Sequence, residues 1–514
     1  MSFMSSMENT LNGKGFNVSH TENGALGYRT TGKNLLDLNF KVATLRKADA
    51  NTIISDFEKA FGEDKMYALK WLFYLRDARE GLGERRTFRT ILTHLANVEP
   101  EIAKAVIGLI AEYGRFDDLL SLVGTECEKE ALEFIKEQLE FDLTNMKAKK
   151  PVSLLAKWLP SSNASSAKTR ELAGKVRCYL GYSEKTYRKT LSKLRKYIDV
   201  VERKMSSGEW SAINYESVPS KANIIYRNAF LKNDENRRRE YLAGLERGEV
   251  KINSSTNFPH DIVHGYVKGG WRFNGREDKA LEALWKALPD TVKENGNTLV
   301  VRDGSGSMTV NVDPNSNMSA LEVATALAVY FSERSSGDFK DKFITFSSEP
   351  RMIDLKNHNT LAAKLRRCYS ETDCSNTNIE KTFDLILQTA INGKMKQEDM
   401  PKNVLIISDM EFDNATYSYG RYGSTVNETL FETIGRKFRD AGYQLPRLVF
   451  WNVNSRTGTI PVKENSLGVA LVSGFSVNVC KMVLSGELDP YKALIEQLDV
   501  ERYKPVEEAV KDLV

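Results

Sequence analysis

A chain of 514 residues is too long for one ordinary hydrophobic core, so two or more domains are expected. Its hydrophobic content of 41% and charged content of 28% fit a soluble globular protein, and the lack of any run of 18 or more apolar residues argues against a transmembrane helix. The net charge of +4 divides unevenly, with 48 Lys and Arg against 40 Asp and Glu in residues 1–296 (+8) and 25 against 29 in residues 297–514 (−4), which suggests separate partners.

The cysteines and the N-terminal residues indicate the cellular compartment. The five cysteines are scattered, and none forms a CxxC pair, which argues against a zinc site and against a disulfide framework. Residues 1–18 lack the basic-then-apolar order of a signal peptide. We therefore expect a cytoplasmic protein with no membrane attachment.

The first half of the chain has a helical pattern. Residues 1–35 are polar and rich in glycine, asparagine and threonine, which predicts an N-terminal arm. Beyond this arm, apolar residues recur at spacings of three and four, as at Ala68, Trp71 and Leu75. Many short helices without intervening strands predict a stack of helical repeats over residues 36–295, although no clean sequence period marks them.

The pattern changes after Gly296, where short apolar runs alternate with helical segments. Strands are expected at residues 298–301, 343–346, 404–407, 448–451 and 469–472, and helices at residues 317–334, 379–391, 427–441, 477–484 and 490–498. Strands that alternate with helices predict a mostly parallel sheet that is covered on both faces. The expected fold class is therefore α + α/β, with a helical repeat domain followed by a Rossmann-like domain at residues 296–514.

Three oxygen-bearing side chains follow the first expected strand, at Asp303, Ser305 and Ser307. Loops at the carboxyl ends of strands bind ligands in open α/β sheets, and a carboxylate with two hydroxyls offers the hard oxygen donors that suit Mg²⁺. Thr377 adds a third hydroxyl before a later helix, and Asp409 adds a second carboxylate after a later strand, directly or through water. These five residues predict a site for Mg²⁺ or another divalent cation; the alternative is the same fold without a bound ion.

This ordered set resembles the von Willebrand factor A domain, in which a DxSxS loop, a later threonine and a later aspartate form a metal-ion-dependent adhesion site (MIDAS). The resemblance covers residues 296–514 and implies that the ion takes a carboxylate from a protein partner. One departure is Met410, at a position where the family often has glycine. Neither Ser305 nor Ser307 has a nearby histidine in the sequence to serve as a base, so hydrolysis is not expected.

Four stretches of the helical part carry a second resemblance. They are residues 73–77 (FYLRD), 81–86 (GLGERR), 113–118 (YGRFDD) and 155–161 (LAKWLPS). With the following A domain they resemble the Ro autoantigen family, whose helical module is called TROVE, and more closely a group of uncharacterised bacterial, phage and plant proteins with the same layout. The resemblance implies a ring of HEAT-like repeats that binds small structured noncoding RNA or single-stranded RNA ends, as a ribonucleoprotein linked to RNA quality control.

The charge of one segment agrees with RNA binding. Residues 168–204 hold 12 Lys and Arg against 4 Asp and Glu. The densest run of positive charge comprises Lys185, Arg188, Lys189, Lys193, Arg195 and Lys196. Most of these side chains would share one broad helix face that could follow phosphates, and Tyr182, Tyr187 and Tyr197 could stack on bases. The alternative is a solvated basic helix whose tyrosines pack into the core.

The sequence therefore supports two functions of different classes. The first is a non-enzymatic, Ro-like RNA-binding protein with noncoding RNA as its partner. The second is a metal-dependent scaffold that uses the adhesion site to hold an acidic side chain of a protein partner and binds no RNA. A third class is an enzyme with an unrecognised site, but no motif in the sequence indicates one.

Overall fold

The computed structural model of the chain describes residues 17–270, 272–292, 297–314, 316–346, 350–371, 379–413, 430–461, 469–479, 487 and 489–514. The chain divides into two units, each with its own core. The sheet unit contains the described residues up to Thr52 together with Asn257–Gln497, and the helical unit contains Ile53–Thr256 together with Leu498–Val514. Each unit thus combines segments that are distant in the sequence, and its limits differ from the expected ranges 1–35, 36–295 and 296–514.

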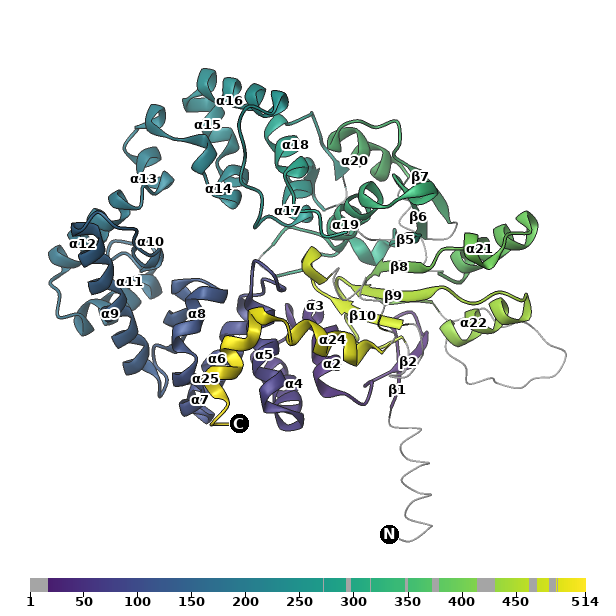
Figure 1. Cartoon of the computed structure of the whole chain (residues 1–514), viewed down its shortest axis with the longest axis horizontal. Coiled ribbons are helices and arrows are strands. Elements are labelled where there is room, and N and C mark those ends of the chain that lie inside the picture. The colour runs from purple at the N-terminus through teal and green to yellow at the C-terminus, as the bar shows by residue number, and fades with distance from the viewer. Residues whose placement is uncertain are drawn as a thin grey trace, which may run out of the picture. The chain divides into compact units, whose positions relative to one another are not determined.

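A six-stranded mixed sheet forms the centre of the sheet unit (Figure 1). Its strands are β5 (Thr298–Asp303), β6 (Lys342–Phe346), β7 (Arg351–Asp354), β8 (Asn403–Ser408), β9 (Arg447–Asn452) and β10 (Val469–Ser473). They lie in the order β7-β6-β5-β8-β9-β10, and every neighbouring pair is parallel except β6 and β7. Apolar runs predict five of these strands; β7 has no such run, because three of its four residues are exposed.

Helices pack on this sheet, as the alternating pattern predicts. One of them is α19 (Ala320–Arg334), which begins with a capping box between Ser319 and Glu322 and contacts β5, β6 and β8. The other described helices of the sheet unit after Asn257 are α17 (Pro259–Val263), α18 (Lys279–Lys286), α20 (Leu361–Ser370), α21 (Ile379–Gly393), α22 (Leu430–Asp440) and α24 (Pro490–Leu498). The expected combination of a helical region and a C-terminal sheet with parallel strands is therefore confirmed.

The described N-terminal residues pack on the sheet unit instead of extending as an arm. β1 (Val18–His20) and β2 (Leu26–Tyr28) pair as an antiparallel hairpin, and Tyr28 forms a bridge with Ile460. Gly27 is needed at this contact, because a β-carbon there would lie 2.5 Å from a methyl carbon of Thr459. The next helices are α2 (Asn34–Phe40), which contacts β10, and α3 (Val42–Leu45).

The helical unit contains no strand between residues 53 and 256, as its periodicity predicts. Its helices are α4 (Ala50–Glu63), α5 (Lys65–Arg76), α6 (Arg86–Val98), α7 (Pro100–Ala105), α8 (Ile107–Tyr113), α9 (Glu128–Lys147), α10 (Leu155–Trp158), α11 (Ala167–Tyr179), α12 (Glu184–Tyr197), α13 (Val201–Ser206), α14 (Ser220–Ile225), α15 (Arg227–Asn233) and α16 (Glu235–Arg247). Among the helices that the structure describes, none is long and apolar enough to cross a membrane.

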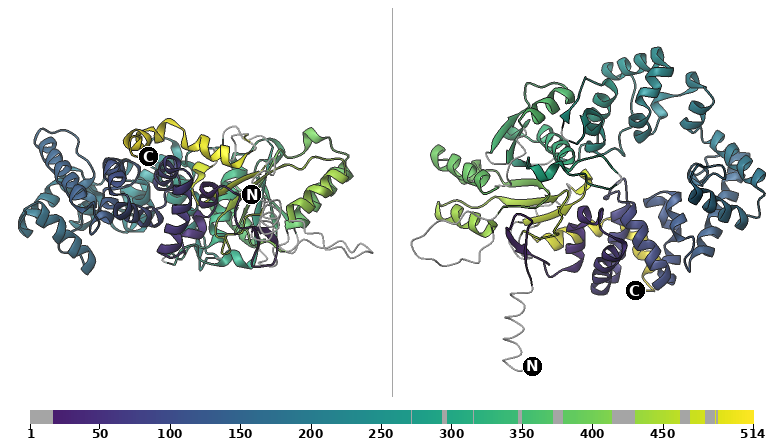
Figure 2. Two further views of the ribbon diagram at one scale, coloured as in Figure 1. Left: turned by 90° about the horizontal axis from the view of Figure 1, so that it is seen from below. Right: turned by 180° about the vertical axis from the view of Figure 1, so that it is seen from behind.

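The C-terminal residues complete the core of the helical unit. α25 (Lys504–Val510) packs against α5 (Figure 2). Asp77, which caps the end of α5, is fully buried and accepts a 2.9 Å hydrogen bond from the Arg502 guanidinium. The Tyr503 ring packs against the rings of Tyr74 and Tyr113. These contacts explain why the last residues belong to the helical unit, although they are far in sequence from the rest of that unit.

Candidate functional site

The chain reverses direction across the sheet between β5 and β8. From β5 it continues to β6 and β7 on one side, and it then returns to β8 on the other side of β5. Asp303 is the last residue of β5, and Ser408 is the last residue of β8. The two loops that begin there leave the same edge of the sheet, which is the usual ligand position at a topological switch point.

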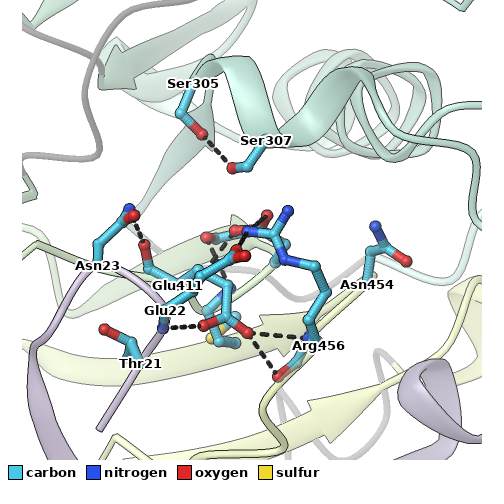
Figure 3. A network of polar contacts seen from close by, with 12 residues as sticks. Thr21, Glu22, Asn23, Ser305, Ser307, Glu411, Asn454 and Arg456 are labelled. Carbon is cyan, nitrogen blue, oxygen red and sulfur yellow. Dashed lines mark hydrogen bonds and ion pairs between the residues drawn. The ribbon is translucent and has the colours of Figure 1, made fainter.

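The loop after β5 brings three oxygen donors together. Asp303 is fully buried, and its carboxylate accepts hydrogen bonds from the Ser305 backbone N–H at 2.8 Å and from the Ser408 hydroxyl at 2.6 Å. The hydroxyl oxygens of Ser305 and Ser307 lie 2.9 Å apart and share a hydrogen bond, which is drawn as a dashed line in Figure 3. Burial raises the pKa of Asp303, and the hydrogen bonds from Ser408 and Ser305 partly oppose this rise.

Asp409 adds a second fully buried carboxylate to this edge. One of its oxygens accepts the Glu411 backbone N–H at 3.3 Å, and the other oxygen, Oδ2, makes no hydrogen bond within the described residues. Burial, followed by the neighbouring charge of Asp303, raises the pKa of Asp409 to about 7, while the Ser307 hydroxyl and the Arg456 charge oppose the rise. Asp409 therefore lies near Asp303 and Ser307, and the two carboxyl groups disfavour negative charge on each other.

The chemistry of this donor set fits a divalent cation. It combines two buried carboxylates with hydroxyls, and Asp409 Oδ2 offers a position that no described residue fills with a hydrogen bond. No group of three His, Cys, Asp or Glu residues suited to a metal occurs in the described part of the chain. The structure brings together four of the five predicted ligands, whereas Thr377 lies outside the described residues.

The residue after Asp409 adopts a backbone conformation that glycine favours. Met410 has a φ of 62°, in the left-handed region, and its side chain is buried. Its backbone N–H donates to the Ser408 hydroxyl oxygen at 3.0 Å, which holds the turn in place. The turn is therefore kept although glycine is absent, at a cost of about 1–2 kcal/mol in backbone strain.

A third carboxylate, Glu411, holds neighbouring segments around the site. It is fully buried and accepts the backbone N–H groups of Glu22 at 2.7 Å, Arg456 at 2.8 Å and Thr457 at 3.0 Å. Its carbonyl oxygen accepts the Asn23 side-chain amide at 2.7 Å. Figure 3 shows this arrangement below the two serines. Glu411 thus fixes the turn of the N-terminal hairpin and the loop after β9 next to Asp409.

Basic and amide groups surround the two aspartates. The Arg456 guanidinium forms an ion pair with Glu22 and lies 3.6 Å from Asp409 Oδ2. In Figure 3 its side chain is directed toward the serines. Burial and the Arg456 charge lower the pKa of Lys47, which also interacts with the charge of Asp409. The buried amide nitrogen of Asn454 has no hydrogen-bond partner among the described residues.

Sequence reasoning missed Glu22, Glu411 and Arg456. Glu411 follows Asp409 by two residues, so its position in the same loop was the one signal available. Glu22 and Arg456 carry no local signal, because they lie 389 and 45 positions from Glu411 in the chain and meet it only through folding.

The predicted RNA-binding residues all lie on α12 of the helical unit. Five of them have exposed side chains that form no hydrogen bond or ion pair within the described residues. These five are Lys185, Arg188, Lys189, Lys193 and Lys196. The sixth, Arg195, is partly buried and donates to the carbonyl oxygens of Ala156 and Leu159, both at 2.8 Å. Arg195 therefore fixes the end of α10, and only the other five are available to a ligand.

The tyrosines of this segment divide in the same way. Tyr187 is fully buried, and its hydroxyl donates to the Pro160 carbonyl at 2.9 Å, so the expectation that it could stack on a base is wrong. It occupies the core because it lies on the same helix face as Leu191 and Leu194. Tyr197 is 39% exposed, which leaves part of its ring accessible.

Two family models match the chain. DUF2828, a domain of unknown function, matches residues 21–141 and 163–298, and DUF7788, a second domain of unknown function, matches residues 297–512. The first match includes Glu22 on the N-terminal hairpin, and the second includes Asp303, Asp409 and Arg456. The residues around the candidate site therefore come from both matched regions.

One curated relative extends along nearly the whole chain. It is "Uncharacterized protein L728" of Acanthamoeba polyphaga mimivirus, which is 31% identical over 530 residues, covering 95% of this chain and 89% of the viral protein. Neither its name nor the two family descriptions mention a ligand, a partner or a reaction.

Proposed function

The chain belongs to the DUF2828 family, and we propose that it is a binding protein that holds a carboxylate of a protein partner through a divalent cation at Asp303, Ser305, Ser307 and Asp409. One observation carries this proposal: two fully buried carboxylates meet at the switch point of the sheet, and one oxygen of Asp409 makes no hydrogen bond within the described residues. Burial of two neighbouring carboxylates costs free energy, and a bound divalent cation would offset that cost. A cation-binding role accounts for this arrangement.

The arrangement of the strands supports a likeness to the von Willebrand factor A domain. Counted along the chain from β5, the sheet has the order 3-2-1-4-5-6, which is typical of doubly wound α/β sheets. The DxSxS loop follows the first of these strands, as in the adhesion site of that domain. Met410 adopts the left-handed backbone conformation that suits the glycine often found at this position in von Willebrand factor A domains.

The surroundings of the site favour an anionic ligand. A bound divalent cation would attract a carboxylate at its open position, and Arg456 adds positive charge near Asp409. Lys47 contributes a second positive charge, and the Asn454 amide nitrogen is a donor without an acceptor in the described part of the chain. Together these groups suit a carboxylate better than a neutral or cationic partner.

The first test measures the metal alone. Titration of the purified protein with Mn²⁺ at about pH 8, followed by calorimetry or electron paramagnetic resonance, should reveal one tight site that Mg²⁺ displaces. Asp303→Asn should abolish the site, because it removes a ligand charge with little change in shape. Asp384→Asn, which neutralises a partly exposed carboxylate on α21, is the matched control and should bind Mn²⁺ as the wild type does. Equal binding by both variants would place the ion elsewhere.

The second test measures the partner's chemistry. Random peptides displayed on phage should be selected on the full chain in Mg²⁺ and eluted with EDTA. Enriched sequences should share an Asp or Glu, and their binding should be lost with Asp303→Asn. Peptides that remain bound in EDTA, or that lack an acidic residue, would contradict a carboxylate-binding site.

A second candidate function is RNA binding on α12, in line with the likeness to Ro proteins. The observation that favours it is the set of five exposed basic side chains on one helix, none of which forms an ion pair with a described residue. Such groups can contact phosphates without first breaking an internal contact. This function would be independent of the metal site, since the two lie in different units of the chain.

Filter binding of a mixed pool of single-stranded and hairpin RNA tests this candidate. A triple change of Lys185, Lys189 and Lys193 to Glu should weaken binding to all RNAs about equally, since phosphate contacts carry no base information. Wild-type affinity should fall with salt, with a slope of roughly 0.7 to 0.9 for each phosphate contact. The matched control changes three scattered exposed lysines of the same unit, Lys129, Lys232 and Lys511, to Glu. If the wild type retains no RNA at low salt, RNA binding is excluded.

A further inference from the structure

Arg456 lies between two carboxylates of different character. On one side its guanidinium pairs with Glu22, whose side chain is 56% exposed. On the other side it lies 3.6 Å from Asp409 Oδ2, an oxygen that is fully buried and makes no hydrogen bond within the described residues. A distance of 3.6 Å is too long for a hydrogen bond but short enough for strong charge attraction. Arg456 therefore compensates the charge of Asp409 without filling its hydrogen-bonding position.

The position of Glu22 is fixed by its backbone. Its N–H donates to Glu411 at 2.7 Å, and the neighbouring Thr21 hydroxyl donates to the Phe412 carbonyl at 2.6 Å. Gly24 forms a bridge with Asp413. The turn of the N-terminal hairpin is thus attached to the residues that directly follow Asp409. The backbone of Glu22 is consequently held beside the site, whereas its exposed side chain can turn together with Arg456.

We propose that Arg456 is the built-in cation of this site and competes with a divalent ion for Asp409, while Glu22 on the N-terminal hairpin retains Arg456 as its ion-pair partner when the ion enters. This inference rests on the proposed cation-binding function. It makes ion binding an exchange of positive charges at Asp409, in which the guanidinium gives up its approach to Asp409 and keeps its ion pair with Glu22. Ion binding and the seating of the hairpin are therefore coupled.

The exchange predicts opposite effects for the two partners. Removal of the Arg456 charge leaves the divalent ion without a competitor for Asp409, so the affinity of the protein for the ion should rise. Removal of the Glu22 charge takes away both an attractive charge near the ion and the alternative partner of Arg456, so the affinity should fall. Each change should be about tenfold, at the low end of what a neighbouring charge does to the proton affinity of a carboxyl group.

The experiment measures Mn²⁺ affinity of the full chain by calorimetry. Arg456→Gln should bind Mn²⁺ about tenfold more tightly than the wild type, and Glu22→Gln about tenfold more weakly. Lys396→Gln and Glu398→Gln are matched controls, because they neutralise an exposed ion pair before β8, at the opposite end of that strand, and should leave the affinity unchanged. Arg456→Lys keeps the charge and should stay near the wild-type affinity.

A second measurement follows the hairpin itself. Hydrogen exchange of residues 19–28 should slow when Mn²⁺ binds to the wild type, because Glu22 then holds Arg456 more firmly. The slowing should disappear in Glu22→Gln, whose backbone contacts to Glu411 are unchanged. This readout needs only a folded protein and does not depend on the Arg456 variants.

The outcomes separate the two proposals. If the wild type binds no Mn²⁺, the proposed function fails and the exchange fails with it. If the wild type binds Mn²⁺ but Arg456→Gln does not bind it more tightly, the proposed function stands and the exchange is overturned. If hydrogen exchange of the hairpin is the same with and without Mn²⁺, the coupling between ion binding and the hairpin is overturned, and the proposed function stands.

Discussion

The Ser408 hydroxyl donates a 2.6 Å hydrogen bond to the Asp303 carboxylate, so the last residues of two neighbouring parallel strands are joined by their side chains. Both residues are fully buried, and Asp303 therefore relies on protein donors in place of water. The same Ser408 oxygen accepts the Met410 N–H at 3.0 Å. One hydroxyl thus links Asp303, at the end of β5, to the turn that follows Asp409.

Ser408→Ala tests this link. In EDTA the free energy of unfolding should fall by about 1–3 kcal/mol, because Asp303 stays buried but loses a hydrogen bond to a charged group. Urea unfolding followed by circular dichroism measures the change. Ser332→Ala is the control, since it removes an equally buried hydroxyl that bonds only the neutral Val329 carbonyl, and its loss should be smaller. Equal losses would contradict a special role for Ser408.

The raised pKa of Asp409 predicts a pH dependence of stability. Burial and the Asp303 charge raise the pKa from 3.8 to about 7, so between these values the folded protein holds a proton that the unfolded chain releases. This contribution to stability is fully present below 3.8 and is lost as the pH rises to about 7. In EDTA, Asp409→Asn should therefore lose less free energy of unfolding than the wild type over this range, as urea titrations at several pH values would show.

The same pKa predicts how ion binding responds to pH. A divalent ion must displace the proton of Asp409, so Mn²⁺ affinity should fall by up to about tenfold for each pH unit below about 7. Calorimetry in buffers of different ionisation enthalpy would count the released protons. An affinity that stays constant between about pH 5 and pH 8 would argue against Asp409 as a ligand.

The left-handed backbone of Met410 predicts an unusually small effect of glycine. Met410→Gly loses a buried side chain but relieves strain at a φ of 62°. Met400 is equally buried and has a φ of −71°, so Met400→Gly loses a side chain without relief. The first variant should therefore be about 1–2 kcal/mol more stable than the second in thermal or urea unfolding. An equal or greater loss at Met410 would show that its backbone is not strained.

Arg195 and Lys193 should differ in their effect on stability, although they are two residues apart. Arg195→Ala removes hydrogen bonds to the carbonyl oxygens of Ala156 and Leu159 and should cost roughly 1.5–3 kcal/mol. Lys193→Ala changes an exposed side chain without a partner in the described residues and should stay within about 0.5 kcal/mol of the wild type. Thermal unfolding of both variants measures the difference, and equal stabilities would contradict the contacts of Arg195.

The sequence determined the features that depend on local pattern. Helical periodicity between residues 53 and 256 and alternating apolar runs after residue 297 predicted most of the elements but not β7 or α20, because burial of one face requires a fixed spacing of apolar residues. The position of Asp303 at the end of a strand followed from the same pattern. It placed the candidate site at the carboxyl edge of the sheet before any contact was known.

Only the tertiary structure decided which distant segments meet. Glu22 approaches Arg456 because Glu411 binds backbone N–H groups from two loops at once. Glu22 and Glu411 are 389 positions apart, and no local spacing encodes such a contact. The division of α12 into buried Tyr187 and exposed Lys193 likewise required the packing of α10 and α9 against one face of the helix. Side-chain burial and long-range charge contacts depend on the complete packing, whereas element type depends on a few neighbouring residues.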